Sequence, residues 1–249
     1  MITRLAPTPS GFLHTGNLVN FALTARLARE NGAEILLRID DADTARIRQA
    51  YVQDVFDALS WLGISWSIGP RTVEDVPEWS QKTRQSKYRR TARQLHDAGA
   101  AYVCQCSRAQ WADYGGAGCP QDCESRQLTL ASGENALRLA IEGSRDVVLW
   151  RREDGPSYHL ASIVDDDHFG VDLVVRGADL QESTDIQRAI SRAIPGSRFH
   201  EAEVVHHGLL TDDDGRKLSK SAGHGTTAPA RSDALRSDID RYVNELLGG

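Results

Sequence analysis

The first hundred residues alternate between short apolar runs and segments in which apolar residues recur every three or four positions. The runs predict buried strands at 2–5 and 33–39, and the periodic segments predict helices at 18–28, 52–62 and 84–98. Gly32 and Gly63 follow the first two helical segments, where glycine commonly ends a helix. Because strands and helices alternate, we expect a parallel sheet whose strands are joined by crossover helices.

The alternation breaks after residue 100 and resumes near residue 146. Three later stretches have strand character: "DVVLWRRED", "YHLASIV" and "VDLVVRGADL". The segment "STDIQRAISRAI" predicts a helix capped by Ser183 or Thr184, and a last helix is expected at about 232–247. We therefore predict the first half of an α/β domain at 1–100, an insertion at 101–145, the second half at 146–224 and a short helical tail at 225–249.

Composition and charge limit the possible partners. The chain has 249 residues, of which 40% are hydrophobic and 26% charged, and its formal net charge is −6. A nucleic acid would therefore have to be bound by a local basic patch, because phosphates are neutralised by lysine and arginine. No stretch approaches the ~20 consecutive apolar residues of a membrane span, and the N-terminus lacks the pattern of a signal peptide. We expect a cytoplasmic protein without a membrane partner.

The segment "RLAPTPSGFLHTGN", residues 4–17, joins the first predicted strand to the first predicted helix. Such a junction presents free backbone N–H groups and the positive end of a helix dipole, which together favour a phosphate. His14 can donate a hydrogen bond to a phosphate there, and Gly16, beside Asn17, lets a nucleotide approach the backbone. Taken alone, the same pattern also suits an ordinary surface turn.

A second segment, "GRKLSKS" at residues 215–221, contains two lysines close together. By itself it would be a polar, solvated loop. Paired with the N-terminal segment, it resembles the HIGH and KMSKS signatures of class I aminoacyl-tRNA synthetases. The A-P-[ST]-P-[ST]-G run before the histidine is similar to the glutamyl branch of that family.

The resemblance extends over residues 1 to about 225. It includes "LLRIDDADTARI" at 36–47, "YHLASIVDDDHFGVDLVVRGADL" at 158–180 and the cysteine-containing insertion, in the order that the family shows. It implies a Rossmann-like class I synthetase catalytic domain with a parallel sheet, interrupted by a zinc-bearing insertion that binds the acceptor.

The resemblance also implies residues that bind glutamate. Arg4 matches the arginine that pairs with the side-chain carboxylate of the substrate, and Thr8 and Asp40 match the positions that hold the α-amino group. Tyr158 and Arg176 match the remaining glutamate contacts. Asp40 stands where the bacterial glutamyl enzymes usually carry glutamate, so its shorter side chain has less reach.

For ATP, the resemblance implies His14, Gly16 and Asn17 on one side and Lys217 and Lys220 on the other. The expected reaction is attack of the substrate carboxylate on the α-phosphate, with pyrophosphate leaving. Lys217, Lys220 and His14 would act catalytically by offsetting the negative charge that develops, and Mg²⁺ would accompany ATP. No side chain is needed as nucleophile or general base, because the substrate carboxylate is already ionised.

The cysteines follow the pattern C-x-C-x₁₂-C-x₃-C and could supply four thiolates to one tetrahedral zinc: Cys104, Cys106, Cys119 and Cys123. Because C-x-C is tighter than the usual C-x-x-C, the spacing alone leaves unligated thiols as an alternative. The segment "CQCSR" matches the C-x-C-[ST]-R with which the zinc-bearing insertion of many glutamyl-type enzymes begins. Four thiolates leave no open position on the metal, so we expect a structural zinc, one per chain.

The acceptor of the glutamyl group is a separate question. Full-length glutamyl-tRNA synthetases carry a large anticodon-reading part after the lysine loop, whereas 28 residues follow Ser221 here (249 − 221), so we expect no anticodon-binding domain. Within the glutamyl branch the chain resembles the glutamyl-Q tRNA(Asp) synthetases, truncated paralogues that tend to read R-G-A-D-L, with alanine at the position of Ala178. This resemblance implies activation of glutamate without tRNA, and transfer to the queuosine base of tRNA(Asp).

Two alternatives stay open at this point. The chain could adenylate glutamate and pass it to a small amine or a carrier, since it is short and acidic. It could also be a paralogue without catalytic activity that acts as a binding module, although both phosphate-binding segments are intact.

Overall fold

The computed structural model describes residues 1–43, 47–114, 118–131, 133–141, 145–208 and 228–248. The chain forms two compact units. The first unit comprises Met1–Gln81, Gly170–Glu182 and Ala202–Gly249, and the second comprises Lys82–Phe169 and Ser183–Glu201. Each unit is described by itself below.

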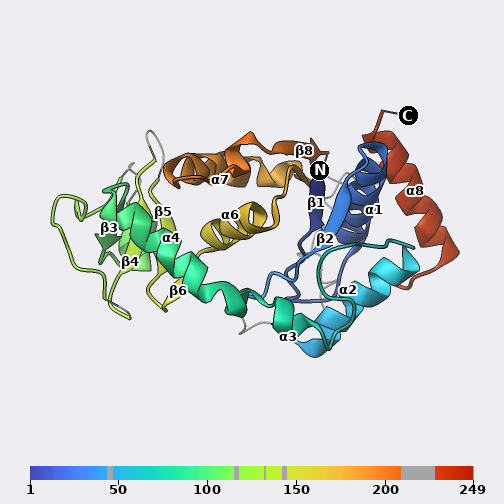
Figure 1. Cartoon of the computed structure of the whole chain (residues 1–249), viewed down its shortest axis with the longest axis horizontal. Coiled ribbons are helices and arrows are strands. Elements are labelled where there is room, and N and C mark those ends of the chain that lie inside the picture. Colours follow the sequence, from blue (N-terminus) through green and yellow to red (C-terminus); the bar gives the residue numbers. More distant parts are fainter. Residues whose placement is uncertain (44–46, 115–117, 132, 142–144, 209–227, 249) are drawn as a thin grey trace. The chain divides into compact units, whose positions relative to one another are not determined.

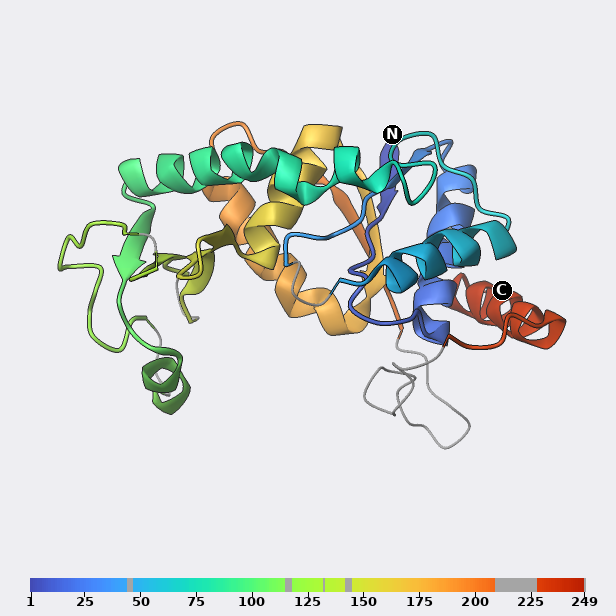
Figure 2. The same ribbon diagram turned by 90° about the horizontal axis from the view of Figure 1, so that it is seen from below.

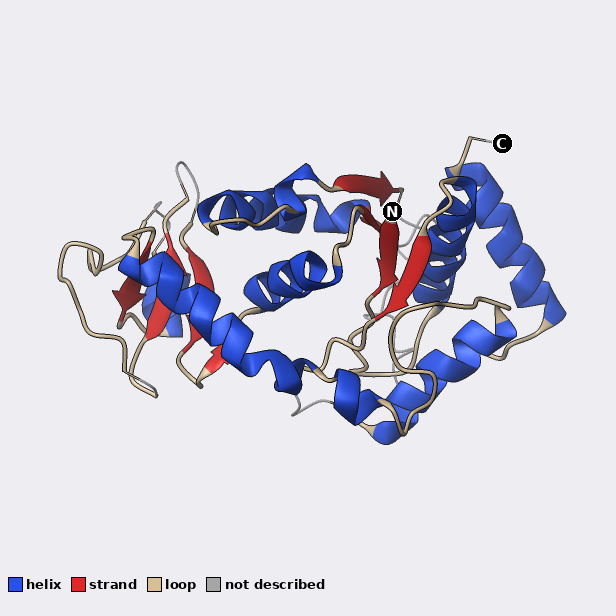
Figure 3. Cartoon of the chain, viewed as in Figure 1, coloured by secondary structure: helices blue, strands red, loops and turns tan. Residues whose placement is uncertain are grey.

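The first unit contains a four-stranded sheet in which every strand pair is parallel. Its order is β2 (Glu34–Leu37), β1 (Ile2–Leu5), β7 (Leu173–Gly177) and β8 (Glu203–His207). Figure 1 labels β1, β2 and β8, and Figure 3 draws the strands in red. The chain moves from β1 outward to β2 on one side, and from β7 outward to β8 on the other. The strand order therefore reverses between β1 and β7, which is where open α/β sheets bind ligands.

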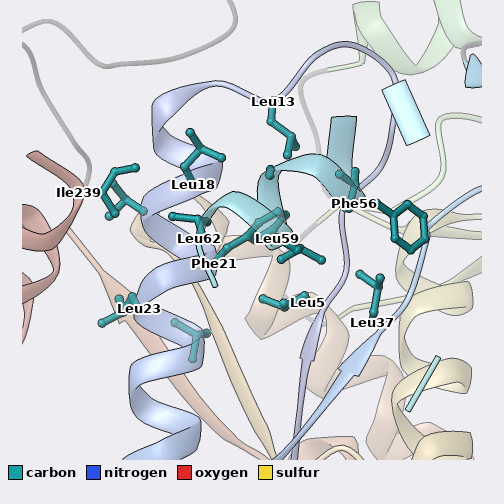
Figure 4. Packing of buried hydrophobic residues seen from close by; sticks show 14 of the residues in the cluster. Leu5, Leu13, Leu18, Phe21, Leu23, Leu37, Phe56, Leu59, Leu62 and Ile239 are labelled. Carbon is teal, nitrogen blue, oxygen red and sulfur yellow. The ribbon is translucent and has the colours of Figure 1, made fainter. Parts of the chain in front are cut away.

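Helices cover this sheet and enclose its core. They are α1 (Thr15–Glu30), α2 (Gln49–Trp61), the short α3 (Val76–Trp79) and α8 (Asp233–Leu246). Helix α1 packs on β1, β2 and β7 and also contacts α8, which lies beside it in Figure 2. Figure 4 shows side chains from the sheet and the helices meeting in one apolar cluster, among them Leu5, Leu37, Leu18, Phe21, Leu59 and Ile239.

Most of the predicted elements of this unit are confirmed. The strands and both helices predicted within residues 2–62 are present, and the C-terminal helix begins after the N-cap Ser232. Gly32 and Gly63 have φ of +61° and +62°, the left-handed conformation that glycine adopts most readily just past a helix end. None of the helices in the described ranges combines the length and apolarity that a membrane span requires.

The second unit is built on a small antiparallel sheet of four strands: β3 (Ala101–Cys104), β4 (Ala136–Leu139), β5 (Val147–Arg151) and β6 (Gly155–Pro156). Its helical elements are most of η2 (Gln81–Arg84), α4 (Gln85–Asp97), α5 (Arg108–Asp113), α6 (Tyr158–Phe169), most of α7 (Gln181–Ala193) and η4 (Phe199–Glu201). The helix predicted at 84–98 is thus confirmed as α4, and "DVVLWRRED" contains β5. The antiparallel sheet continues past residue 145, where the predicted insertion ends.

Two predictions about secondary structure are wrong. The stretch "YHLASIV" forms the start of helix α6 instead of a strand, with the Ser157 hydroxyl accepting a hydrogen bond from the Leu160 backbone N–H at 3.2 Å. A short apolar run cannot distinguish a buried strand from a buried helix. Ser183 and Thr184 do not cap α7 either, because the short helix η3 (Ala178–Leu180) leads directly into α7 at Gln181.

A buried ion pair joins α6 to the start of α4. Asp165 is fully buried, and Arg84 donates to its two oxygens at 2.7 and 3.1 Å. The Tyr88 hydroxyl donates to the same carboxylate at 2.7 Å. Burial and the Asp165 carboxylate both raise the pKa of Tyr88, so its hydroxyl stays protonated as a donor. A buried carboxylate needs such partners, because burial of an uncompensated charge is costly.

The Tyr88→Phe variant tests this arrangement. It removes one hydrogen bond to a buried charge while keeping the ring, so the free energy of unfolding should fall by about 1.5–3 kcal/mol. Urea unfolding followed by circular dichroism measures the loss. The matched control is Tyr242→Phe on α8, which should change stability by less than about 0.5 kcal/mol. An equal, small effect of both substitutions would contradict the account.

Candidate functional site

Two arginines lie on the two central strands of the parallel sheet, near their carboxyl ends. Arg4 on β1 is 7% exposed and Arg176 on β7 is 3% exposed. The Nη1 atom of Arg4 donates to the carbonyl oxygen of Val175 on the neighbouring strand at 3.5 Å. Two buried guanidinium groups at the point where strand order reverses are suited to bind a ligand that carries carboxylates.

The loops that follow β1 and β2 run side by side. The Arg38 N–H donates to the Leu5 carbonyl at 2.9 Å, and the Asp40 N–H donates to the Pro7 carbonyl at 3.0 Å. These two bonds bring the exposed Thr8 close in the fold to Asp40, whose side chain is 6% exposed. The structure thus places both residues at the carboxyl edge of the sheet.

Asp40 already has a cationic partner within the chain. Arg38 donates from Nε to Oδ1 of Asp40 at 2.6 Å and from Nη2 to Oδ2 at 3.3 Å, and both side chains are buried. No local sequence pattern indicates this pair, because arginine two residues before an acid is common on surfaces. A substrate ammonium group at Asp40 would therefore share the carboxylate with Arg38.

Asp41 holds the loop that begins at Asp40 against a more distant part of the chain. Its carboxylate accepts from the Ser80 hydroxyl at 2.5 Å and from the Gln81 N–H at 2.7 Å. The Gln81 side-chain oxygen in turn accepts from the Ala42 N–H at 2.8 Å. These contacts fix the loop after β2 and were not predicted from the sequence.

The turn after β1 ends at His14, which is the N-cap of α1 with extended backbone (φ −105°, ψ 169°). The Asn17 side-chain oxygen accepts from the His14 N–H at 3.1 Å, so Asn17 also shapes this helix end. Gly16 lies in the first turn of α1, which contains no acidic residue. The first turn of α1 therefore contributes no carboxylate of its own that would compete with a bound phosphate.

A histidine at the end of β8 also reaches α1. The Asn20 amide nitrogen lies 3.1 Å from Nε2 of His207 and 3.4 Å from the Val175 carbonyl, and Nδ1 of His207 lies 2.9 Å from the Gly208 carbonyl. A neutral imidazole with its proton on Nδ1 satisfies both of its contacts. The chain then enters the segment 209–227, so the predicted Lys217 and Lys220 lie outside the described residues.

Tyr158, the fifth residue predicted to bind glutamate, belongs to the second unit. It is the first residue of α6 and is 47% exposed, with its ring centroid 5.5 Å from that of His159. The structure therefore brings Arg4, Thr8, Asp40 and Arg176 to one edge of the parallel sheet in the first unit, whereas Tyr158 belongs to the second unit.

The four cysteines of the second unit come together, as predicted. Their sulfur atoms all lie within 4.8 Å of one another, with contacts of 3.4, 3.7 and 3.8 Å, and three of the four residues are buried. A tetrahedral metal bound at about 2.3 Å from each sulfur would place the sulfurs about 3.8 Å apart. The cluster therefore has the size that a four-thiolate metal site requires, and the cysteines could hold a metal ion.

The thiols of this cluster differ in acidity. Burial raises the pKa of Cys104 and of Cys106. Burial acts in the same direction on Cys119, but the backbone N–H groups of Cys123 and Gln121 outweigh it and lower the pKa of Cys119 to about 7. Full ionisation of the set consequently depends on a cation that compensates the buried charges.

Comparison with known proteins shows sequence similarity over nearly the whole chain. The family described as tRNA synthetases class I (E and Q), catalytic domain, matches residues 1–136 and 126–236. The glutamyl-Q tRNA(Asp) synthetase of Synechococcus sp. (strain CC9605) is 37% identical over 99% of this chain and 82% of its own length. The protein of the same name from Rhodobacter capsulatus is 33% identical over 98% of this chain and 99% of its own length.

Solved structures with low sequence identity share the fold. The glutamate-tRNA synthetase of Elizabethkingia anophelis superposes with a TM-score of 0.68 at 22% identity, covering 90% of this chain and 53% of that protein. The methionyl-tRNA synthetase of Mycobacterium tuberculosis superposes with a TM-score of 0.59 at 17% identity, covering 98% of this chain and 62% of that protein. The predicted class I synthetase fold is thus confirmed.

Proposed function

This chain belongs to the class I tRNA synthetases of the glutamate and glutamine group, which are ligases, and from that premise we propose that it activates glutamate with ATP and attaches it to the queuosine base of tRNA(Asp). Two of its relatives are named glutamyl-Q tRNA(Asp) synthetase, and these names support tRNA(Asp) as the acceptor. Ala178 in "VRGADL" fits the same group, because its members tend to carry alanine at this position. Activation would need no tRNA.

The observation that carries the proposal is the pair of buried guanidinium groups at the carboxyl edge of the parallel sheet. Arg4 and Arg176 offer two cations to a substrate with two carboxylates, and glutamate is such a substrate. We assign Arg4 to the side-chain carboxylate, and Arg176 together with Tyr158 to the remaining contacts. Thr8 and Asp40 would hold the α-amino group, with Asp40 bound to Arg38 at the same time.

ATP would lie at the N-terminus of α1. His14, Gly16 and Asn17 border this helix end, and Lys217 and Lys220 would approach the phosphates from the lysine segment. The glutamate carboxylate attacks the α-phosphorus, the bond to the bridging oxygen breaks, and pyrophosphate leaves. The protein positions the reactants and stabilises the negative charge of the transition state. Mg²⁺ bound to ATP would neutralise part of the phosphate charge.

A local basic surface formed by α4 and the preceding short helix η2 supports an RNA partner. Although the chain is acidic overall, this surface presents five cationic side chains that are exposed or partly exposed: Lys82, Lys87, Arg89, Arg90 and Arg93. The opposite face of α4 is buried through Tyr88, Ala92 and Leu95. Arg89 pairs with Asp154 at 3.0 Å, whereas Arg90 and Arg93 form no ion pair among the described residues. RNA phosphates would complement such a surface.

For the cysteine cluster we propose one structural zinc. Four thiolates satisfy a tetrahedral zinc and leave no open position for substrate, so the ion would hold the loops between β3 and β4 in shape.

Glutamate-dependent ATP–pyrophosphate exchange, measured with and without tRNA, tests the activation step. We expect exchange without tRNA, followed by transfer of labelled glutamate to tRNA(Asp) that contains queuosine and none to tRNA(Asp) that lacks it. Exchange without transfer to either tRNA would contradict the RNA acceptor and favour a small amine or carrier. An absence of glutamate-dependent exchange would contradict the enzyme and favour a binding module.

Variants of the two lysines assigned to ATP and of the two arginines assigned to glutamate should separate catalysis from substrate binding. Lys217→Ala and Lys220→Ala should each lower kcat of exchange by about 100-fold, because each removes a cation from the transition state, with the KM for glutamate within about twofold. Arg4→Ala and Arg176→Ala should instead raise the KM for glutamate by about 30-fold or more. Arg26→Ala, which breaks an exposed pair on α1, is the control and should change neither. If any of these four variants shows unchanged kinetics, the role assigned to that residue is contradicted.

Metal analysis of protein purified without chelators should find about one zinc per chain. In protein stripped of metal, iodoacetamide should label Cys119 first, with a rate that rises through pH 7 as its thiolate forms, since its pKa is about 7. Added zinc should block the labelling. Folded, metal-free protein, or labelling that zinc leaves unaffected, would rule the site out.

A further inference from the structure

Trp111 on α5 carries a buried N–H group that the chemistry described so far does not use. Its side chain is 7% exposed and packs in one cluster with Cys104, Cys106 and Cys123. The indole N–H interacts with the sulfur of Cys104, yet it makes no well-formed hydrogen bond among the described residues. A buried donor with so weak an acceptor as a thiol is unfavourable, so this group is suited to a stronger acceptor at the same place.

A guanidinium group lies over the face of the same indole. The central carbon of the Arg138 guanidinium, on β4, is 3.8 Å from the centroid of the Trp111 ring, which is a cation–π contact. Nη1 of Arg138 donates to the Asp146 carbonyl at 2.9 Å, and this bond holds the group in place. Arg138 also interacts favourably with a thiolate at Cys104. The indole N–H and the guanidinium therefore act on the same sulfur.

A metal ion bound by the four cysteines would turn that sulfur into a strong acceptor. Four thiolates around one Zn²⁺ leave two negative charges in excess, and three of the four cysteines are buried. Such charges need donors and cations close by. Backbone N–H groups supply part of this, since Cys106 donates to the Cys104 sulfur and two further N–H groups donate to that of Cys119. Trp111 and Arg138 add a buried side-chain donor and a cation.

A second arginine approaches the cluster from a more open position. Nη1 of Arg126 lies 3.9 Å from the sulfur of Cys123, but Arg126 is exposed, so solvent screens its charge. Arg138 is only partly exposed and is stacked on a buried ring. Its charge is therefore felt more strongly by the thiolates.

We propose that Trp111 and Arg138 are positioning residues for the metal: the indole N–H donates to the metal-bound sulfur of Cys104, and the guanidinium stacked on the ring offsets the negative charge of the thiolates. This inference rests on the structural zinc proposed above. Neither residue supplies a ligand atom, so both act through Cys104. Together they should strengthen the retention of the metal.

The first test compares zinc affinity in the full chain by competition with a chromophoric chelator. Trp111→Phe keeps an aromatic ring beneath the guanidinium and removes the N–H, and Arg138→Met removes the cation. Each variant should bind zinc about tenfold more weakly, as is typical when a partner of a metal ligand is lost. Arg138→Lys retains the charge and should recover part of the loss.

Two matched controls make the comparison specific. Trp61→Phe makes the same substitution on α2 in the first unit. Arg108→Met, on α5 beside Trp111, breaks an exposed pair with Glu153 at 3.1 Å. Both variants should keep the zinc affinity of the wild type within about twofold. Losses in the controls as large as in the test variants would overturn the inference.

Two further measurements separate this role from simple packing of the indole. With saturating zinc, Trp111→Phe should lose about 1.4 kcal/mol more unfolding free energy than it loses without zinc, which is the tenfold affinity change converted. In cobalt-loaded protein, its sulfur-to-cobalt charge-transfer band should move to longer wavelength, because a hydrogen bond no longer stabilises the sulfur electrons. Equal losses with and without zinc, or a band that does not move, would identify a packing role and overturn the inference.

The proposals fail in distinguishable ways. Wild-type protein that binds no zinc would contradict both the zinc site and this inference, while glutamate-dependent exchange would still decide the enzymatic function. Zinc binding by the wild type with unchanged affinity in Trp111→Phe and Arg138→Met would retain the site and reject the role of these two residues.

Discussion

The central constraint on this structure is the parallel pairing of β1 with β2 on one side and β7 on the other. Because the crossovers leave β1 and β7 in opposite directions, the carboxyl ends of these two strands lie at the point where open α/β sheets bind ligands. The residues of the first unit that the structure brings to the candidate site follow from this. Arg4 and Arg176 are buried on the two strands, His14 caps the helix after β1, and the loop with Asp40 is tied to Pro7 after β1.

That arrangement buries charged groups, and the fold compensates them with ion pairs. Asp40 is held by Arg38, Asp54 by Arg231, and, in the second unit, Asp165 by Arg84. Such pairs contribute little net stability compared with apolar packing, but removing one partner is expensive. They therefore fix geometry, and two of the three lie at or next to the proposed ATP and glutamate positions.

Sequence patterns predict the elements that depend on residues close together in the chain. Helices α1 and α2 have clear periodicity and end at Gly32 and Gly63, and the four cysteines lie close in sequence. The start of helix α6 looks like a strand in the sequence because consecutive buried residues there form a short, mainly apolar run, which a buried strand and a buried helix can share. The Leu13–Asp54–Arg231 contacts join residues up to 177 positions apart, which no local pattern encodes.

The resemblance to a known family supplied the candidate site residues, and the structure adds which of them the fold brings together. A direct check of the glutamate site is a calorimetric titration, without tRNA, of a non-hydrolysable glutamyl-adenylate analogue. The account predicts one site per chain and an affinity at least about 30-fold higher than for the glutaminyl analogue, because a neutral amide cannot form the charge-assisted hydrogen bonds that a carboxylate forms with a buried guanidinium. Equal affinities for the two analogues, or no binding of the glutamyl analogue, would contradict it.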